Sequence, residues 1–133
     1  TYENVETHKV ALGNKCEDAV FAESFSGLMG SRLGESGDHL ETVRIETIDR
    51  MLAGDMATFI KMDIEGSELD ALRGAENTIV NNKPYMAICV YHKKEDLIKI
   101  IPYVKSIVPD YKVYLRHHSS TACDLVAYFV INE

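Results

Sequence analysis

The sequence has few cysteines, no tryptophan, no long apolar run and no excess of basic charge. Its three cysteines, Cys16, Cys89 and Cys123, are far apart and odd in number, which argues against a disulfide framework or a CxxC metal site. No run approaches the roughly 20 apolar residues of a membrane span. The net charge of −7 disfavours nucleic acid and anionic membranes as partners, since both attract basic patches. We therefore expect a reduced, cytoplasmic protein with neither kind of partner.

Three common motifs are also missing. The sequence contains no G-x-S-x-G nucleophile elbow, no P-loop and no G-x-G-x-x-G turn. Serine-hydrolase and nucleotide-binding chemistry of those kinds is therefore not indicated. With 133 residues, of which 46% are hydrophobic and 26% charged, the chain is long enough for one globular domain, and we assign residues 1–133 to it.

The most informative stretch is 59–76. A strand-like run over 58–64 contains Asp63, Glu65 follows it, and Gly66 permits a sharp turn. Ser67 is a suitable N-cap for a helix that continues to residue 82. The apolar content of the strand predicts a central position covered on both faces. In open α/β sheets, ligands bind at the carboxyl ends of the strands.

The remaining elements follow from periodicity and turn residues. Further strands are expected over 5–12, 19–24, 41–48, 85–92, 112–117 and 125–131, and helices over 48–53 and 94–108, the latter kinked or divided at Pro102. The strands at 19–24 and 41–48 are expected to pair antiparallel. Between them, the glycine- and serine-rich segment 24–38 suits either a functional lid or a plain connection. The second half reads β-α-β-α-β-β, which predicts a mostly parallel sheet with an antiparallel last strand.

Three side chains are candidates for chemistry. Asp63 and Glu65 lie two residues apart at one strand end, and His92 ends the next strand, so parallel pairing would bring them together. Such a trio can perform general acid–base chemistry or bind a divalent metal. Structural roles remain open as well: Glu65 could accept N–H groups at the helix start, and His92 could be a satisfied structural histidine.

Several spaced motifs together resemble the FkbM-type methyltransferases. They are residues 10–13 (VALG), 43–52, 59–68 (FIKMDIEGSE), 72–76 (LRGAE), 82–84 (NKP), 91–97 (YHKKEDL) and 109–118. The resemblance implies a Rossmann-like class I methyltransferase fold, the cofactor S-adenosylmethionine, and methylation of a hydroxyl on a sugar or natural product.

The same resemblance assigns roles to individual residues. Ala11, Leu12 and Asp63 are the implied cofactor-binding residues: Ala11 and Leu12 would lie near the adenine, and Asp63 would approach the reacting centre. Glu65 and His92 would line the acceptor pocket. Asp63, Glu65 and His92 are thus the implied catalytic residues, and no metal ligand is assigned.

The chain also departs from the family pattern. The first two strands of the sheet, the glycine-rich turn and the ribose-binding acid are missing, so we expect the C-terminal part of a longer domain, with weak cofactor binding and little activity by itself. Strand 58–64 would then have an open edge. We expect strand 5–12, the 19–24/43–48 pair or a second copy of the chain to cover it.

Two other functions remain open at this point. A non-catalytic interaction module would use the exposed sheet edge or segment 24–38 to bind a partner. A metal-dependent hydrolase would use Asp63, Glu65 and His92 as ligands.

Overall fold

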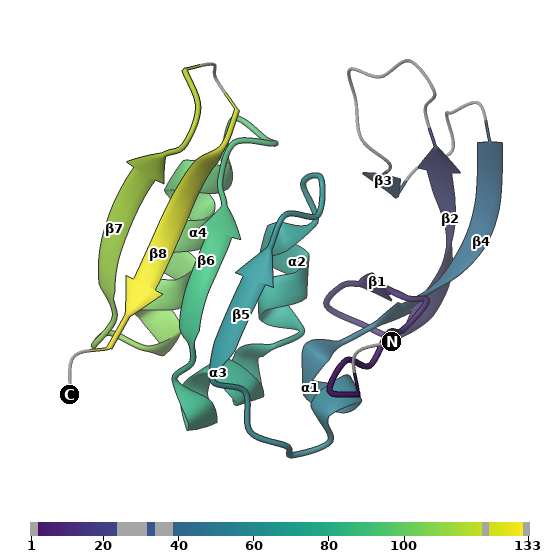
Figure 1. The fold of residues 1–133 in the computed structure, drawn as a ribbon, viewed down its shortest axis with the longest axis horizontal. Helices are drawn as coiled ribbons and strands as arrows, with labels where there is room; N and C mark the ends of the chain where they lie inside the picture. Colours follow the sequence, from purple (N-terminus) through teal and green to yellow (C-terminus); the bar gives the residue numbers. More distant parts are fainter. Residues whose placement is uncertain (1–2, 24–31, 34–38, 121–122, 132–133) are drawn as a thin grey trace.

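The structure is a computed structural model that describes residues 3–23, 32–33, 39–120 and 123–131. These residues form two four-stranded sheets that lie beside each other, with helices packed against the C-terminal one (Figure 1). Most of the segment 24–38 lies outside the described residues, so its proposed role as a lid stays a prediction. Within the described part of the chain, no helix is long and apolar enough to cross a membrane.

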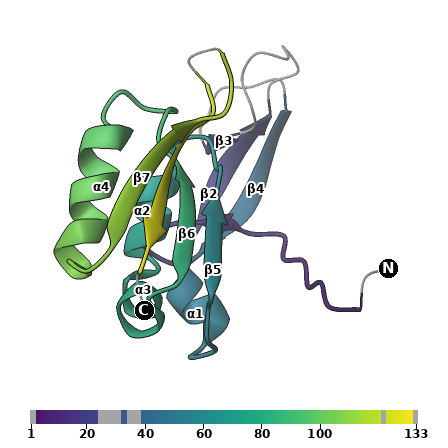
Figure 2. The same ribbon diagram turned by 60° about the vertical axis from the view of Figure 1, so that its left-hand side comes forward.

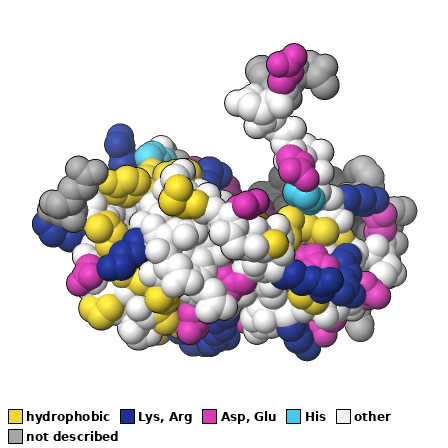
Figure 3. Space-filling view, turned by 90° about the horizontal axis from the view of Figure 1, so that it is seen from below, with side chains coloured by type: hydrophobic (Ala, Val, Ile, Leu, Met, Phe, Trp, Pro, Cys, Tyr) yellow, Lys and Arg dark blue, Asp and Glu magenta, His cyan; other side chains and the backbone are white. Residues whose placement is uncertain are grey.

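The first sheet contains the N-terminal strands. They are β1 (Ala11–Leu12), β2 (Glu17–Glu23), β3 (Arg32–Leu33) and β4 (His39–Glu46), in the order β1-β4-β2-β3. The predicted antiparallel pairing is confirmed, because β2 and β4 pair over seven residues. The predicted strand 5–12 is wrong over most of its length. Residues 3–9 are exposed and project away from the body of the protein (Figures 2 and 3), and Val5, the one apolar residue among them, is 61% exposed.

The second sheet carries the candidate residues. It contains β5 (Phe59–Met62), β6 (Tyr85–Cys89), β7 (Lys112–His117) and β8 (Leu125–Val130), in the order β5-β6-β8-β7. β5 and β6 are parallel, and β8 is antiparallel to both of its neighbours, as predicted for the last strand. The expectation of a mostly parallel sheet is wrong, because β8 lies between β6 and β7 and is antiparallel to both, so that only the β5–β6 pairing of this sheet is parallel. The N-terminal strands form a sheet of their own. The fold is α/β with two mixed sheets.

β5 is an edge strand, which confirms the open edge expected from the missing strands of the family pattern and contradicts the central position predicted from its apolar content. Ile60 and Met62 are buried, whereas Phe59 and Lys61 are exposed, because helices cover one face of the strand only (Figure 2). Among the described residues β5 pairs with β6 alone, so the expected rearrangement, in which N-terminal strands cover its edge, is not found. Pairing with a second copy of the chain stays a prediction.

Four helices complete the fold of the described residues. They are α1 (Ile48–Leu52), α2 (Glu68–Arg73), α3 (Glu76–Asn82) and α4 (Asp96–Ile107). The hydroxyl of Thr47 caps α1 by accepting from the Arg50 amide at 3.2 Å. The single helix predicted after Ser67 is instead two helices, and α4 is one continuous helix that contains Pro102.

The break between α2 and α3 has two visible causes. The backbone at Gly74 approaches Gly13 so closely that a Cβ there would overlap the Gly13 carbonyl oxygen. The Asp49 carboxylate then accepts hydrogen bonds from the backbone amides of Asn77 and Thr78, at 3.1 and 2.8 Å, in the first turn of α3. Contacts from the N-terminal half of the chain therefore accompany the change of helix direction.

The main core lies between the second sheet and its helices. Its fully buried members include Met62, Leu72, Ile79, Ile88, Ile100, Val104, Tyr111 and Phe129. Cys89 is buried in this region and has a free thiol. This core holds the carboxyl ends of β5 and β6 in fixed relative positions, and the candidate residues extend from those ends.

Candidate active site at the carboxyl ends of β5 and β6

The parallel register of β5 and β6 brings the predicted residues together. Met62, the last residue of β5, pairs with Ile88 of β6, so the polypeptide leaves both strands at the same edge of the sheet. His92 Nε2 lies 3.3 Å from Oδ1 of Asp63 and 3.7 Å from Oε2 of Glu65. The predicted proximity of the three side chains is therefore observed, whereas their catalytic roles stay predictions.

The turn between β5 and α2 has an uncommon backbone. Glu65 and Gly66 both have positive φ angles, of 55° and 94°. Glycine adopts such angles readily, whereas a glutamate in this region costs about 1 kcal/mol or more. The conformation reverses the chain direction within two residues and leaves the Glu65 side chain 40% exposed beside His92. A functional role for this carboxylate would account for the strain.

Glu68 is the member of the site that sequence reasoning missed. Its side chain has no exposed surface, and its Oε1 accepts a hydrogen bond from the Ile64 amide at 2.9 Å. The same oxygen lies 2.8 Å from Nδ1 of His92. On sequence grounds Glu68 appeared only as a favourable acid in the first turn of a helix. The signal available in the sequence was that Glu68 is the third acid, after Asp63 and Glu65, within six residues of the end of β5.

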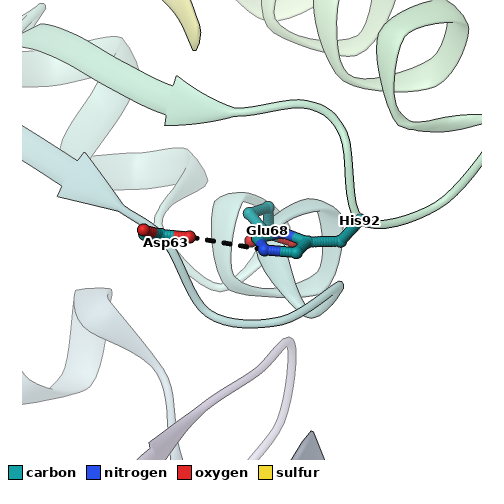
Figure 4. A group of neighbouring side chains, drawn as sticks. All are labelled: Asp63, Glu68 and His92. Atoms are coloured by element: carbon teal, nitrogen blue, oxygen red, sulfur yellow. Dashed lines mark ion pairs between the residues drawn. The ribbon is translucent and has the colours of Figure 1, made fainter. Parts of the chain in front are cut away.

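His92 is enclosed by carboxylates. Its side chain is 8% exposed, and it points toward Asp63 and Glu68, as Figure 4 shows. Although Nδ1 is close to Glu68 and Nε2 to Asp63, neither nitrogen is aligned for a hydrogen bond. The contacts are therefore electrostatic, and both nitrogens remain available to a better-placed partner.

Neighbouring side chains support this arrangement. The Tyr91 hydroxyl donates to Oδ1 of Asp63 at 3.3 Å. Burial, followed by the charge of Asp63, raises the pKa of Tyr91, so the phenol keeps its proton and remains a donor. Asp96 accepts a hydrogen bond from the Lys93 amide at 2.6 Å, which ties the loop that carries His92 to the start of α4. Burial raises the pKa of Asp96.

The predicted cofactor residues Ala11 and Leu12 lie elsewhere in the fold. They form β1 of the first sheet, opposite Ile45 and Glu46 of β4. Both are half-buried, and Leu12 packs against the main core. Among the described residues, no hydrogen bond or ion pair links either of them to Asp63 or His92. Their proximity to an adenine ring stays a prediction.

The site combines a buried half with an accessible half. Glu68 and His92 form the buried half, and Asp63 and Glu65 the accessible one. Exposed carboxylates can accept a proton from a hydroxyl group or attract a cation, while buried neighbours hold the geometry.

Comparison with known proteins agrees with this location. The model of the methyltransferase FkbM domain matches residues 2–117, which include every candidate residue. The crystal structure of methyltransferase FkbM from Methylobacillus flagellatus KT is similar at 46% sequence identity with a TM-score of 0.64. The similarity covers 67% of this chain and 24% of that one, so the matched part of the chain corresponds to about a quarter of that protein's length. No curated protein matches.

Proposed function

Because the chain belongs to the FkbM methyltransferase family, we propose that it is part of an enzyme that transfers a methyl group from S-adenosylmethionine to a hydroxyl of a sugar or natural product. One observation carries the proposal. Asp63, Glu65 and His92 meet at the carboxyl ends of two parallel strands, within the part of the chain that matches the family. Ligands of α/β folds bind at such edges.

The residues present fit the reactive end of the cofactor. S-adenosylmethionine, when bound, supplies an electrophilic methyl group on a positively charged sulfur. The exposed carboxylates of Asp63 and Glu65 provide negative charge at the accessible side of the site, which favours a cation there. Ala11 and Leu12 offer the apolar surface that an adenine requires. The sequence has no glycine-rich turn for the rest of the cofactor.

The protein's main contribution would be positioning and proton removal. As the hydroxyl oxygen bonds to the methyl carbon and the carbon–sulfur bond breaks, the hydroxyl proton must leave. Glu65 and His92 are the two candidate bases, and Glu65 is the more accessible of them. Asp63, held by Tyr91, would orient the acceptor or the cofactor.

A transfer assay tests this proposal. The complete gene product is incubated with methyl-labelled S-adenosylmethionine and a panel of hydroxyl-bearing saccharides, and label in the acceptor is measured. We expect transfer by the wild type and by the surface control Glu17→Gln, and a loss of about 10²- to 10⁴-fold in Glu65→Gln if Glu65 is the base. Absence of transfer to every hydroxyl acceptor would contradict the proposed activity.

A further inference from the structure

We infer that Asp63, Glu68 and His92 form a binding site for one divalent cation of the first transition series, of which Zn²⁺ is the reference case. The inference goes beyond methyl transfer and does not depend on it. It differs from the metal site left open on sequence grounds, for which Asp63, Glu65 and His92 are the candidate ligands, because the structure groups Glu68 and not Glu65 with the other two.

The donor atoms are already close together. One ligand atom from each of the three residues lies within 4.8 Å of the other two. Zinc places imidazole and carboxylate donors roughly 2 Å from the ion. Asp63 lies at Nε2 of His92 and Glu68 at Nδ1, so one of the two carboxylates would rotate toward the ring nitrogen that the other contacts to bring the set around one ion (Figure 4).

A second observation concerns unsatisfied atoms. Oε2 of Glu68 and both ring nitrogens of His92 are buried and have no hydrogen-bond partner among the described residues. Burying a polar or charged group without a partner is costly. The three atoms lie on the two buried side chains of the cluster. One ion would give Oε2 of Glu68 and one ring nitrogen of His92 the partner that each of these atoms lacks, while Oε1 of Glu68 keeps the Ile64 amide.

The negative charge of the neighbouring carboxylates also favours a bound cation. Asp63, Glu65 and Glu68 surround one imidazole, and none of these carboxylates has an ion pair with a lysine or arginine in the described parts of the chain. Even a protonated His92 would supply one positive charge for three carboxylates, without an aligned N–H. A divalent ion supplies twice that charge at the point where the carboxylates converge.

The kind of ion follows from the ligands. Imidazole suits zinc, iron, nickel and copper, whereas carboxylates also suit magnesium and manganese. The mixture of one His92 nitrogen with oxygens from Asp63 and Glu68 favours a transition ion such as Zn²⁺ over Mg²⁺ or Ca²⁺. Three protein ligands leave a coordination position open, which is typical of catalytic rather than structural zinc.

The surroundings resemble the support that metal ligands usually have. Tyr91 donates a hydrogen bond to Asp63, and the Ile64 amide donates one to Glu68. Such outer contacts orient the ligands. If the proposed methyl transfer is correct, an ion here would polarise the acceptor hydroxyl and leave Glu65 as the base.

Direct metal binding tests the inference. The complete protein is freed of metal with a chelator and titrated with Zn²⁺ by calorimetry, and with Co²⁺ by visible absorption, without any methyl donor. We expect one ion per chain. Asp63→Asn and His92→Ala should lose binding or bind more than about 100-fold more weakly, because loss of a direct ligand costs more than loss of an outer contact that orients one. His8→Ala, on the exposed N-terminal segment, is the matched control and should bind like the wild type.

Two results would overturn the inference. One is the absence of stoichiometric Zn²⁺ binding by the folded wild type, and the other is unchanged binding in Asp63→Asn. Because Asp63 is partly exposed, that variant should keep its fold, which circular dichroism verifies. Metal binding without methyl transfer would support this site and contradict the proposed function. Methyl transfer without metal binding would support the proposed function and contradict this site.

Discussion

Nδ1 of His92 lies 2.8 Å from Oε1 of Glu68, a carboxylate with no exposed surface. Glu68 begins α2, whereas His92 lies in the loop after β6. The contact therefore joins the two elements that leave the carboxyl ends of β5 and β6. It holds the imidazole against a fixed carboxylate and directs Nε2 toward the exposed side of the site.

Replacing Glu68 by alanine should destabilise the protein. The change leaves the partly buried Ile64 amide without its acceptor and opens a cavity beside His92. We expect the free energy of unfolding to fall by about 1–3 kcal/mol, measured by urea denaturation. The variant Glu6→Ala, on the exposed N-terminal segment, should change it by less than about 0.5 kcal/mol. Equal stability of the two variants would show that the Glu68 contacts contribute nothing.

Replacing His92 by alanine should lower kcat of the complete enzyme sharply. His92 is either the proton acceptor or a ligand of the inferred cation, and each role acts directly on the acceptor hydroxyl. The expected loss is about 10²-fold or more, measured by steady-state kinetics, with His8→Ala as the control. An unchanged kcat would remove His92 from the proposed machinery.

The isolated chain should bind S-adenosylhomocysteine weakly or not at all. The sequence has no glycine-rich turn, so it lacks the backbone N–H groups and close approach that such turns provide. Calorimetric titration of the chain, with the complete gene product as the positive control, measures this directly. Micromolar binding by the isolated chain would refute the expectation.

Replacing Gly74 by alanine should be more harmful than replacing Gly54. A Cβ at Gly74 would overlap the Gly13 carbonyl oxygen, whereas one at Gly54 has nothing within 4 Å and meets only the strain of a positive φ. We expect a loss of about 1–3 kcal/mol or more for Gly74→Ala. The cost for Gly54→Ala should be about 1 kcal/mol. Thermal or urea unfolding of both variants distinguishes them, and a larger loss at Gly54 would contradict the close approach.

The contribution of Asp49 to stability should depend on pH. Burial opposes its ionisation, but hydrogen bonds from Thr78 and Asn77 outweigh burial and lower its pKa below the ordinary value of 3.8. Because the pKa is lower in the folded state, the contribution is complete above the unfolded pKa and is lost as pH falls through the folded one.

Comparison with Asp49→Asn at two pH values measures this contribution. The variant should be less stable than the wild type near neutral pH, and the difference should shrink below the ordinary aspartate pKa of 3.8. Asp55→Asn, at an exposed position, is the control. A difference that stays constant with pH would mean that the carboxylate charge is not responsible.

Much of the site could be predicted from sequence. The run over 58–64 with Asp63, Glu65 and Gly66 indicated a strand, a sharp turn and a helix, and the structure has these elements in that order. A second strand ending just before His92 was enough to predict the convergence, because carboxyl ends of adjacent parallel strands meet at one edge. Local periodicity and turn chemistry carry this information.

The rest of the site and of the fold could not be predicted from the sequence, because it depends on contacts between distant parts of the chain. Glu68 could not be identified as a buried partner of His92, because its burial requires the loop after β6 to close over it. The break at Gly74 involves Gly13, and the edge position of β5 results from the N-terminal strands forming their own sheet. The sequence by itself thus determined which elements carry Asp63, Glu65 and His92. Only the tertiary structure decided which acid supports His92 and where the sheets end, because burial and strand order depend on all segments packing together.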